Sequence, residues 1–122
     1  MKPTFVLLYV DSPEKSGKFY SQILEREPVE TSPTFNLFAL DGGYMLGLWS
    51  KHTVEPSPGA EAGAAELGFP VGDPAEVAAI EKKWREMGVT IVQPGTELDF
   101  GYTFCGLDLD GHRLRVFAPN GS

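Results

Sequence analysis

Short apolar runs alternate with amphipathic stretches along the chain. The first run, Lys2 to Val10 (KPTFVLLYV), has the length and the aromatic and branched residues of a buried strand. Ser12 or Asp11 can cap the helix that follows, and Pro13 suits its first position because a missing N–H costs nothing there. The apolar stripe expected on this helix comprises Phe19, Tyr20, Ile23 and Leu24.

Three short strands are predicted after the first helix, which ends before Pro28. Their expected bounds are Val29 to Thr31, Phe35 to Leu40 and Tyr44 to Ser50. The tripeptide Asp41-Gly42-Gly43 predicts a tight turn between the last two. The next segment, 51–64, is rich in proline, glycine and alanine, so it is expected to be an exposed linker.

The same order of elements then returns. Glu66 to Val71 is a predicted strand, and a helix is expected to start with Asp73 as cap, Pro74 as first residue and Glu76 completing a capping box. Its apolar stripe comprises Val77, Ile80, Trp84 and Met87, and Gly88 closes it. Three strands follow at Thr90 to Gln93, Tyr102 to Asp108 and Arg113 to Ala118, with Asp110-Gly111 as the last hairpin turn.

Two anchors align these halves as an internal repeat. The run Val10-Asp11-Ser12-Pro13 matches Val71-Gly72-Asp73-Pro74 at an offset of 61, and Asp41-Gly42 matches Asp110-Gly111 at an offset of 69. The second half therefore carries eight extra residues, which we assign to Gln93 to Gly101. The predicted fold is α+β, with βαβββ modules at 1–50 and 65–122 within a single domain, 1–122, because half a chain cannot easily stabilise itself.

Charge and cysteine content narrow the function classes. The net charge of −7 would repel phosphate backbones and anionic lipid heads, so nucleic acid and membrane surfaces are not expected partners, whereas a neutral or cationic ligand is favoured. No apolar run approaches a membrane span, and the first residues lack the pattern of a signal peptide. Cys105 is the only cysteine, which fits a reducing compartment, so the expected location is the cytoplasm.

Two motifs in this doubled order carry a family resemblance. They are Tyr9-Val10-Asp11-Ser12-Pro13 leading to Lys18-Phe19-Tyr20, and the run Leu107 to Val116 (LDLDGHRLRV). With them the chain resembles the vicinal-oxygen-chelate superfamily of glyoxalases, bleomycin-resistance proteins and extradiol dioxygenases. The resemblance implies that each module forms a cupped half-barrel, that the protein is a homodimer, and that modules are exchanged between subunits at the linker.

The resemblance also implies where metal-dependent relatives hold their ion, on the first and last strands of each module. Carried onto this chain, the four positions are Phe5, Leu46, with an uncertainty of one residue, Glu66 and Arg115. Two of these side chains are hydrocarbon and the guanidinium repels a cation, so no metal, no cofactor and no catalytic residue is expected. His52 and His112 are expected to be exposed. A metal-dependent lyase or dioxygenase that recruits Glu66 and His112 is the alternative.

Glu66 and Arg115 would face each other inside the cup, close enough to pair. The pair is either a structural ion pair or a polar anchor for a ligand, and both roles can hold together. The other candidate ligand contacts are Phe5, Phe38, Leu46, Trp49, Tyr102 and Phe104. Trp49 ends a predicted strand beside the linker, where a flat indole could stack on a planar molecule. Cys105, on a predicted strand, is expected to be an inert packed thiol.

Within the superfamily the chain is similar to the antibiotic-sequestering branch, including phenazine-resistance and bleomycin-resistance proteins. The similarity lies in the first strand, in Trp49-Ser50 and in Glu66-Leu67-Gly68. It implies metal-independent binding of a small, planar aromatic or cationic drug or metabolite, and it favours a binding protein over an enzyme. A third hypothesis is an interaction module whose cup is filled by side chains.

Overall fold

The chain forms two compact units. The computed structural model describes residues 1–121. The first unit is Met1–Glu61 and the second begins at Ala62, so the boundary lies within the predicted linker. Val54 in that linker is buried, contrary to the expectation of an exposed segment. The assignment of 1–122 to a single domain stays a prediction.

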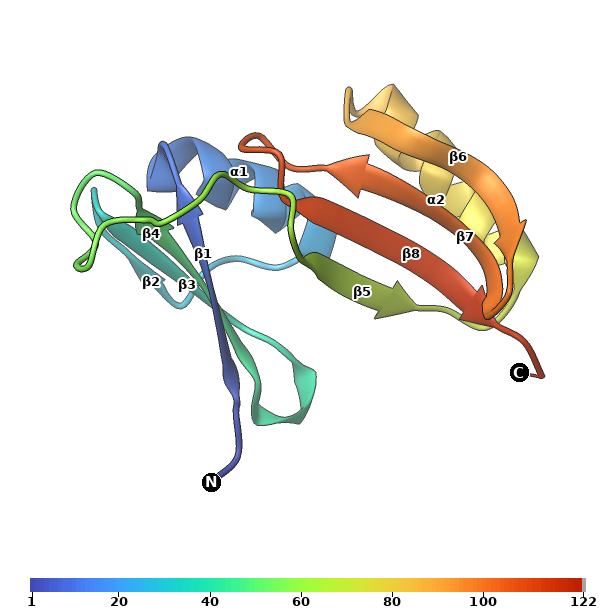
Figure 1. Cartoon of the computed structure of the whole chain (residues 1–122), viewed down its shortest axis with the longest axis horizontal. Helices are drawn as coiled ribbons and strands as arrows, with labels where there is room; N and C mark the ends of the chain where they lie inside the picture. Colours follow the sequence, from blue (N-terminus) through green and yellow to red (C-terminus); the bar gives the residue numbers. More distant parts are fainter. Residues whose placement is uncertain (122) are drawn as a thin grey trace. The chain divides into compact units, whose positions relative to one another are not determined.

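The first unit is one sheet with one helix. Its elements are β1 (Phe5–Val10), α1 (Pro13–Leu24), β2 (Glu30–Thr31), β3 (Phe35–Ala39), a 3₁₀ turn (Asp41–Gly43) and β4 (Met45–Ser50). The strand order across the sheet is β1-β4-β3-β2 (Figure 1). Only β1 and β4 run parallel, and the other pairs are antiparallel. The predicted turn is confirmed, since Gly42 and Gly43 have φ angles of 77° and 84° that favour glycine.

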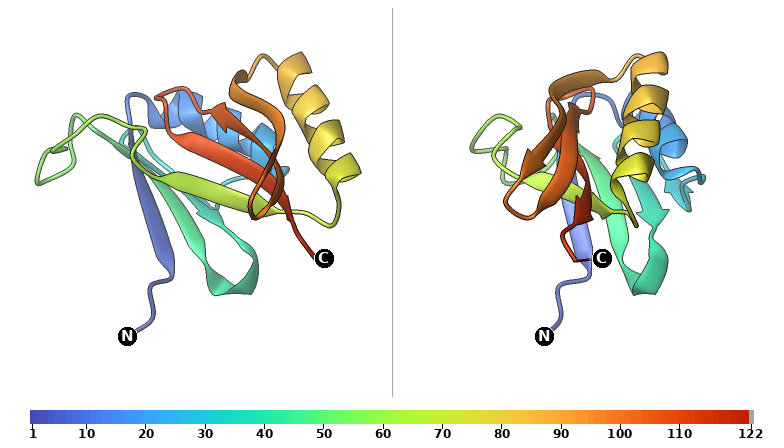
Figure 2. Two further views of the ribbon diagram at one scale, coloured as in Figure 1. Left: turned by 45° about the vertical axis from the view of Figure 1, so that its right-hand side comes forward. Right: turned by 90° about the vertical axis from the view of Figure 1, so that its right-hand side faces the viewer.

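The second unit repeats this arrangement. Its elements are β5 (Glu66–Pro70), α2 (Pro74–Glu86), β6 (Thr90–Leu98), β7 (Gly101–Leu107) and β8 (Arg113–Pro119), in the sheet order β5-β8-β7-β6. Here β5 and β8 are the parallel pair, as β1 and β4 are in the first unit. Helix α2 lies along one face of its sheet (Figure 2). The predicted α+β fold of two βαβββ modules is confirmed. No helix among residues 1–121 is both long and apolar enough to cross a membrane.

Both helices begin where their capping signals predict. The Ser12 hydroxyl accepts a hydrogen bond from the Lys15 N–H at 3.2 Å, which makes Ser12 the cap of α1. Asp73 accepts a hydrogen bond from the Glu76 N–H at 2.9 Å, and the Glu76 carboxylate accepts one from the Gly72 N–H at 2.8 Å. The two reciprocal bonds of a capping box are therefore present, except that the Glu76 carboxylate bonds to the N–H of Gly72 instead of that of the cap residue Asp73.

Helix α1 packs on its sheet through small residues, which corrects the predicted stripe. Its buried residues are Pro13, Ser16, Gly17 and Tyr20. Of the predicted stripe only Tyr20 is fully buried, whereas the other three members are half-buried. The buried Asn36 side chain donates a hydrogen bond from Nδ2 to the Pro13 carbonyl, and it passes directly beside Gly17. A larger residue at 17 would separate helix and strand, so the close approach depends on glycine.

We predict that Gly17→Ala lowers the free energy of unfolding by about 1–2 kcal/mol, although alanine favours helix. The added Cβ would overlap Asn36 Nδ2, so the amide has to move and its bond to Pro13 weakens. Gly59→Ala is the control, because an added Cβ there meets nothing within 4 Å. Urea denaturation of the three proteins checks the prediction. A Gly17→Ala protein at least as stable as the wild type would contradict it.

Strand β6 is longer than predicted. Thr90 to Gln93 was the expected extent, whereas the strand continues to Leu98 and pairs with β7 through two register irregularities, between Ile91 and Gln93 and between Gln93 and Thr96. These irregularities accommodate Pro94 and Gly95, and an edge strand tolerates proline because it has no second neighbour to bond. The extra residues of the second module thus lengthen the hairpin of β6 and β7.

Strand β1 is not the buried strand that its sequence predicts. It lies at the edge of its sheet and pairs only with β4. Phe5 is 59% exposed, Val6 42% and Leu7 43%, and only Val10 at the end of the strand is fully buried. The apolar residues of β1 therefore stay largely exposed. An edge strand has a neighbouring strand on one side only, and the helix covers only one of its faces.

Candidate functional site

Each sheet has one face covered by its own helix and a second face that we call the open face. Alternation along the strands and the pairing register assign side chains to these faces. The open face of the first sheet includes Phe5, Leu7, Tyr9, Phe35, Gly47 and Trp49. The open face of the second sheet includes Glu66, Gly68, Thr103, Cys105, Arg113, Arg115 and Phe117.

The open face of the first sheet is an apolar surface of large side chains. The rings of Phe35 and Trp49 meet edge to face, with centroids 6.0 Å apart. Between them and β1 lies Gly47, where an added Cβ would come within 2.6 Å of Leu7 Cδ2 and 2.9 Å of Phe35 Cζ. The side chains of Leu7 and Phe35 therefore pack directly over Gly47, where any larger residue would collide with them. Two of the predicted ligand contacts, Phe5 and Trp49, lie on this face.

Leu46 and Phe38 lie on the opposite, helix-covered face. They are paired across β3 and β4, and they are 1% and 0% exposed. Their role is therefore core packing, and a ligand on the open face cannot reach them. The register places Met45 and Gly47 on the open face instead, which is the shift of one residue that the sequence alignment of the two modules left open.

Tyr102 and Phe104 are likewise on the helix side of the second sheet. Phe104 is fully buried, and its ring packs edge to face against Trp84 of α2, with centroids 5.2 Å apart. The Tyr102 hydroxyl lies against the backbone of Gly95, where an added Cβ would overlap it. Strand alternation sends both side chains away from the open face, and neither fits the predicted ligand surface.

The predicted pairing of Glu66 and Arg115 is present on the open face of the second sheet. Arg115 donates from Nε and from one terminal nitrogen to the two carboxylate oxygens of Glu66, at 2.7 and 2.8 Å. Its other terminal nitrogen donates to Gln93 Oε1 at 2.8 Å and to Thr103 Oγ1 at 3.3 Å. All three nitrogens of the guanidinium are thus engaged, and the side chain is held across the strands β5, β8, β7 and β6.

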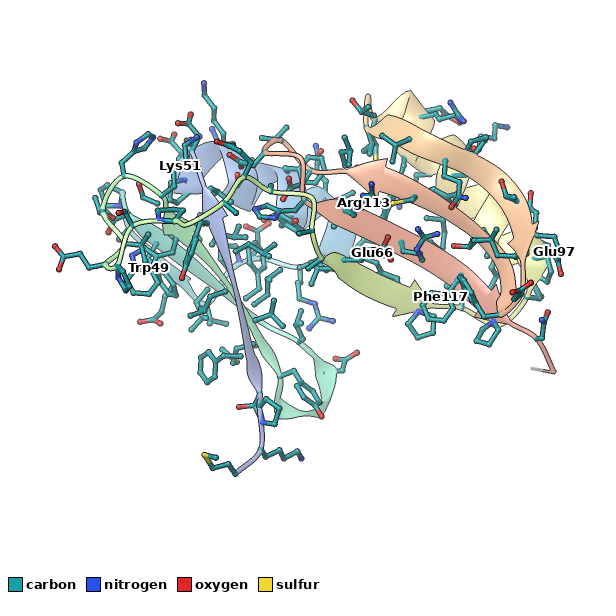
Figure 3. All side chains as sticks on the ribbon, in the orientation of Figure 1. Trp49, Lys51, Glu66, Glu97, Arg113 and Phe117 are labelled. Carbon is teal, nitrogen blue, oxygen red and sulfur yellow. The ribbon has the colours of Figure 1, made fainter. Side chains whose placement is uncertain are left out.

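The electrostatics keep this pair ionised. The hydrogen bond from Arg115 lowers the pKa of Glu66 below its ordinary value, against the opposing effect of burial. The same bond raises the pKa of Arg115. A second guanidinium, that of Arg113, lies 3.9 Å from the Glu66 carboxylate, and half of the Arg113 side chain is exposed. Figure 3 shows Arg113 and Glu66 on the face away from α2. Two guanidiniums and one carboxylate leave this face with a net positive charge.

Cys105 lies beside Arg115 but offers no nucleophile. Its side chain is buried, and burial raises the pKa of the thiol above its ordinary value. The nearby guanidinium opposes that shift without overcoming it. The expectation of a packed thiol agrees with this geometry.

The residues at the family's metal positions do not fit a divalent ion. On the open faces these positions hold Phe5, Met45 or Gly47, Glu66 and Arg115, of which only the glutamate is a hard anionic donor, and it is already bound by a guanidinium. Within residues 1–121 no three His, Cys, Asp or Glu side chains gather as a metal-binding group. His52 is bonded through Nε2 to Asp11 at 2.7 Å, and that bond lowers the pKa of the Asp11 carboxyl.

Sequence reasoning missed the two neutral partners of Arg115. Gln93 and Thr103 complete its bonding from β6 and β7, yet neither residue type stands out in a strand. A signal for Thr103 existed, because it lies two residues before Cys105 and therefore on the same face. For Gln93 there was none, because the register irregularities of β6 hide its orientation.

Comparison with known proteins places this geometry in a family. The model of the Glyoxalase/Bleomycin resistance protein/Dioxygenase superfamily matches residues 2–116. A phenazine antibiotic resistance protein, EhpR of Enterobacter agglomerans, is 31% identical over 119 residues, covering 93% of this chain and 89% of that protein.

Solved structures agree on the fold. A solution NMR structure of a protein from Agrobacterium tumefaciens is 47% identical, with a TM-score of 0.92 over 99% of both chains. A glyoxalase-related enzyme from Fulvimarina pelagi shares the fold at 20% identity, with a TM-score of 0.83 over 96% of this chain and 87% of that one. The chain belongs to the Glyoxalase/Bleomycin resistance protein/Dioxygenase superfamily.

Proposed function

We propose that this protein binds and sequesters a small, planar aromatic antibiotic or metabolite, as a resistance-type protein that works without a metal ion. The observation that carries the proposal is the open face of the first sheet, where the rings of Trp49 and Phe35 form an aromatic wall and Phe35 and Leu7 pack over Gly47. Such a wall suits stacking against a flat ring system. The similarity to a phenazine antibiotic resistance protein supports the same class of ligand.

Metal independence belongs to the same proposal. The guanidinium of Arg115 occupies one metal position and binds the single carboxylate available, so the open face of the second sheet is a fixed polar surface. Sequestration needs no reacting group, and the buried thiol of Cys105 supplies none.

The proposal includes a homodimer, built on the exposed apolar side chains and the free edge of β1. Phe5, Val6, Leu7 and Tyr9 are each 38% exposed or more, which is unusual for four neighbours in a water-facing strand. The outer edge of β1 also has no strand beside it within its sheet, so its backbone can pair with another copy. Exchange of modules between subunits stays part of the proposal, as does a cytoplasmic location.

We predict that Leu7→Glu converts the dimer to a monomer. A charge at the centre of this apolar strand would have to lose its water in the interface, which costs several kcal/mol. Light scattering coupled to size exclusion measures the result. Leu109→Glu is the control, because Leu109 is likewise an exposed leucine, 59% exposed against 43% for Leu7, but belongs to the second unit, outside β1. A wild-type monomer at about 100 μM, or an unchanged Leu7→Glu dimer, would contradict the proposed interface.

A thermal-shift measurement tests the function. Metal-stripped protein is mixed in parallel with phenazine-1-carboxylate, with bleomycin, and with Mn²⁺, Ni²⁺ or Zn²⁺, since a ligand that binds only the folded state raises the melting temperature. The proposal expects a rise with the phenazine and none with the ions. A rise with a metal ion alone would overturn it in favour of a metal-dependent lyase or dioxygenase. No rise with any probe would favour an open face occupied by protein side chains.

A further inference from the structure

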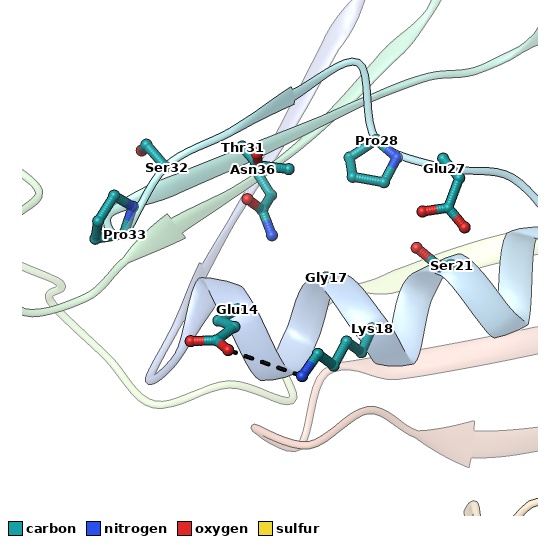
Figure 4. A pocket seen from close by; sticks show the side chains of 10 residues that line it. All are labelled: Glu14, Gly17, Lys18, Ser21, Glu27, Pro28, Thr31, Ser32, Pro33 and Asn36. Atoms are coloured by element: carbon teal, nitrogen blue, oxygen red, sulfur yellow. Dashed lines mark ion pairs between the residues drawn. The ribbon is translucent and has the colours of Figure 1, made fainter.

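The first unit contains a pocket that the proposed function does not use. It lies between α1 and the segment that leads through β2 into β3, and its volume is about 410 Å³, within the range of small-molecule sites. The residues that line it are Glu14, Gly17, Lys18, Ser21, Glu27, Pro28, Thr31, Ser32, Pro33 and Asn36. Figure 4 shows the helix forming one wall and the strand segment the other. Trp49 and the open face are not part of it.

A polar atom of a largely buried residue borders this pocket. Asn36 is 4% exposed and lines the cavity, and its Nδ2 is used by the Pro13 carbonyl. No hydrogen bond to its Oδ1 is present. Within residues 1–121 every side-chain nitrogen or oxygen atom that is sealed from solvent has a partner, so Oδ1 is not sealed from solvent. The Oδ1 atom therefore faces the cavity as a free acceptor. A ligand that donates a hydrogen bond there would satisfy an atom that is otherwise nearly enclosed by protein.

The charged side chains that line the pocket carry a net negative charge. Lys18 lies 3.7 Å from Glu14, and both side chains are about 80% exposed, so that pair neutralises itself at the rim. Glu27 lines the same cavity and has no ion-pair partner in the described part of the chain. The pocket thus presents one unpaired carboxylate and one free amide oxygen, and both are acceptors. Pro28 and Pro33 add apolar surface on the strand side.

We propose that this pocket is a second binding site, specific for a small organic cation with an amine or amidine group. The N–H donors of the cation bond to Asn36 Oδ1 and to the Glu27 carboxylate, and its hydrocarbon body lies against the prolines. Gly17 is required because any side chain there would displace Asn36 from this position. A carboxylate ligand is disfavoured, since it would bring a negative charge to two acceptors.

Benzamidine and its neutral isostere benzamide are suitable probes, because they differ in charge and hardly in shape. The expected result of titrating the ¹⁵N-labelled protein with benzamidine is a set of amide shifts at Gly17, Ser21, Thr31 and Asn36, including the Asn36 side-chain amide. Millimolar affinity is expected for so small a ligand, with benzamide at least 5-fold weaker. Shifts confined to other residues, or equal affinity for the two probes, would overturn the proposal.

Two variants separate recognition from folding. Glu27→Gln removes the unpaired charge from an exposed residue, and it is expected to weaken benzamidine binding at least 5-fold while leaving the spectrum of the free protein unchanged elsewhere. Glu30→Gln is the matched control, because Glu30 is an exposed neighbour on β2 that does not line the pocket, and it should change the affinity less than 2-fold. Equal effects of the two substitutions would show that only the net charge of the chain attracts the probe, and this would overturn the site.

Discussion

Replacing Arg115 by alanine is expected to lower the free energy of unfolding by about 1–3 kcal/mol, even without a ligand. The change leaves Glu66 without its two charge-assisted bonds and leaves Gln93 and Thr103 without their shared donor. The guanidinium side chain is 17% exposed and the carboxylate side chain 32%, so the loss should stay below that for a fully buried pair. Chemical denaturation of the apo protein measures it.

Arg113→Ala is the matched control for this measurement. Arg113 is on the same strand and face, but its side chain is 49% exposed and its only contact with Glu66 is at 3.9 Å. A loss of less than about 0.5 kcal/mol is expected, as for most exposed ion pairs. If Arg115→Ala also costs less than about 1 kcal/mol, the pair is not a structural element, and its role as a ligand anchor gains weight.

The stabilisation by this pair should disappear in acid. The pKa of Glu66 is lower in the folded protein than its ordinary value of 4.5, so the contribution of the carboxylate is complete above that value and is lost as the pH falls through the folded pKa. The difference in the free energy of unfolding between wild type and Arg115→Ala is therefore expected to be constant from about pH 7 to pH 5 and to shrink below about pH 4.5. A difference that does not shrink below about pH 4.5 would contradict the assignment of this stabilisation to the ionised carboxylate of Glu66.

Trp49→Ala is expected to weaken the binding of a planar aromatic ligand by about 1–3 kcal/mol, or roughly 5- to 150-fold. The indole is half-buried on the open face of the first sheet, and Phe35 holds it edge to face. Removing it takes away the larger ring of the wall that the ligand is proposed to stack on. Isothermal titration with phenazine-1-carboxylate measures the change, and the melting temperature of the apo protein shows whether the fold is retained.

Tyr44→Ala is the control for Trp49→Ala. Tyr44 is 43% exposed and immediately precedes β4, but it lies near Lys2, whose ammonium is 5.9 Å from its ring centroid, and outside the aromatic wall. Its replacement should leave the affinity unchanged within 2-fold. Unchanged affinity in the Trp49→Ala protein would remove the indole from the site, while equal losses in both variants would indicate general surface adsorption.

Local signals in the sequence predicted the fold well and the site only in part. Caps at Ser12 and Asp73 mark the helix starts, and the glycine turns mark the hairpins, because each depends on neighbours in the chain. The pairing of Glu66 with Arg115 was also predicted, because the family resemblance placed both residues at metal positions inside one cup. Of the other candidate ligand contacts, Phe38, Leu46 and Phe104 are core residues. The residue type alone does not show whether an apolar side chain on a strand lies on the helix-covered face or on the open face.

By itself, the sequence determined the order of elements and the repeat of the βαβββ module. These depend on residue type and spacing, which are local properties. Only the tertiary structure decided which face of each strand is open, that β1 is an exposed edge, and that Arg115 is held by Gln93 and Thr103 as well. The pocket at Asn36 also belongs to this second group, because it requires α1 and β3 to meet across Gly17. Strand register and the approach of a helix to a sheet are set by packing between residues distant in sequence.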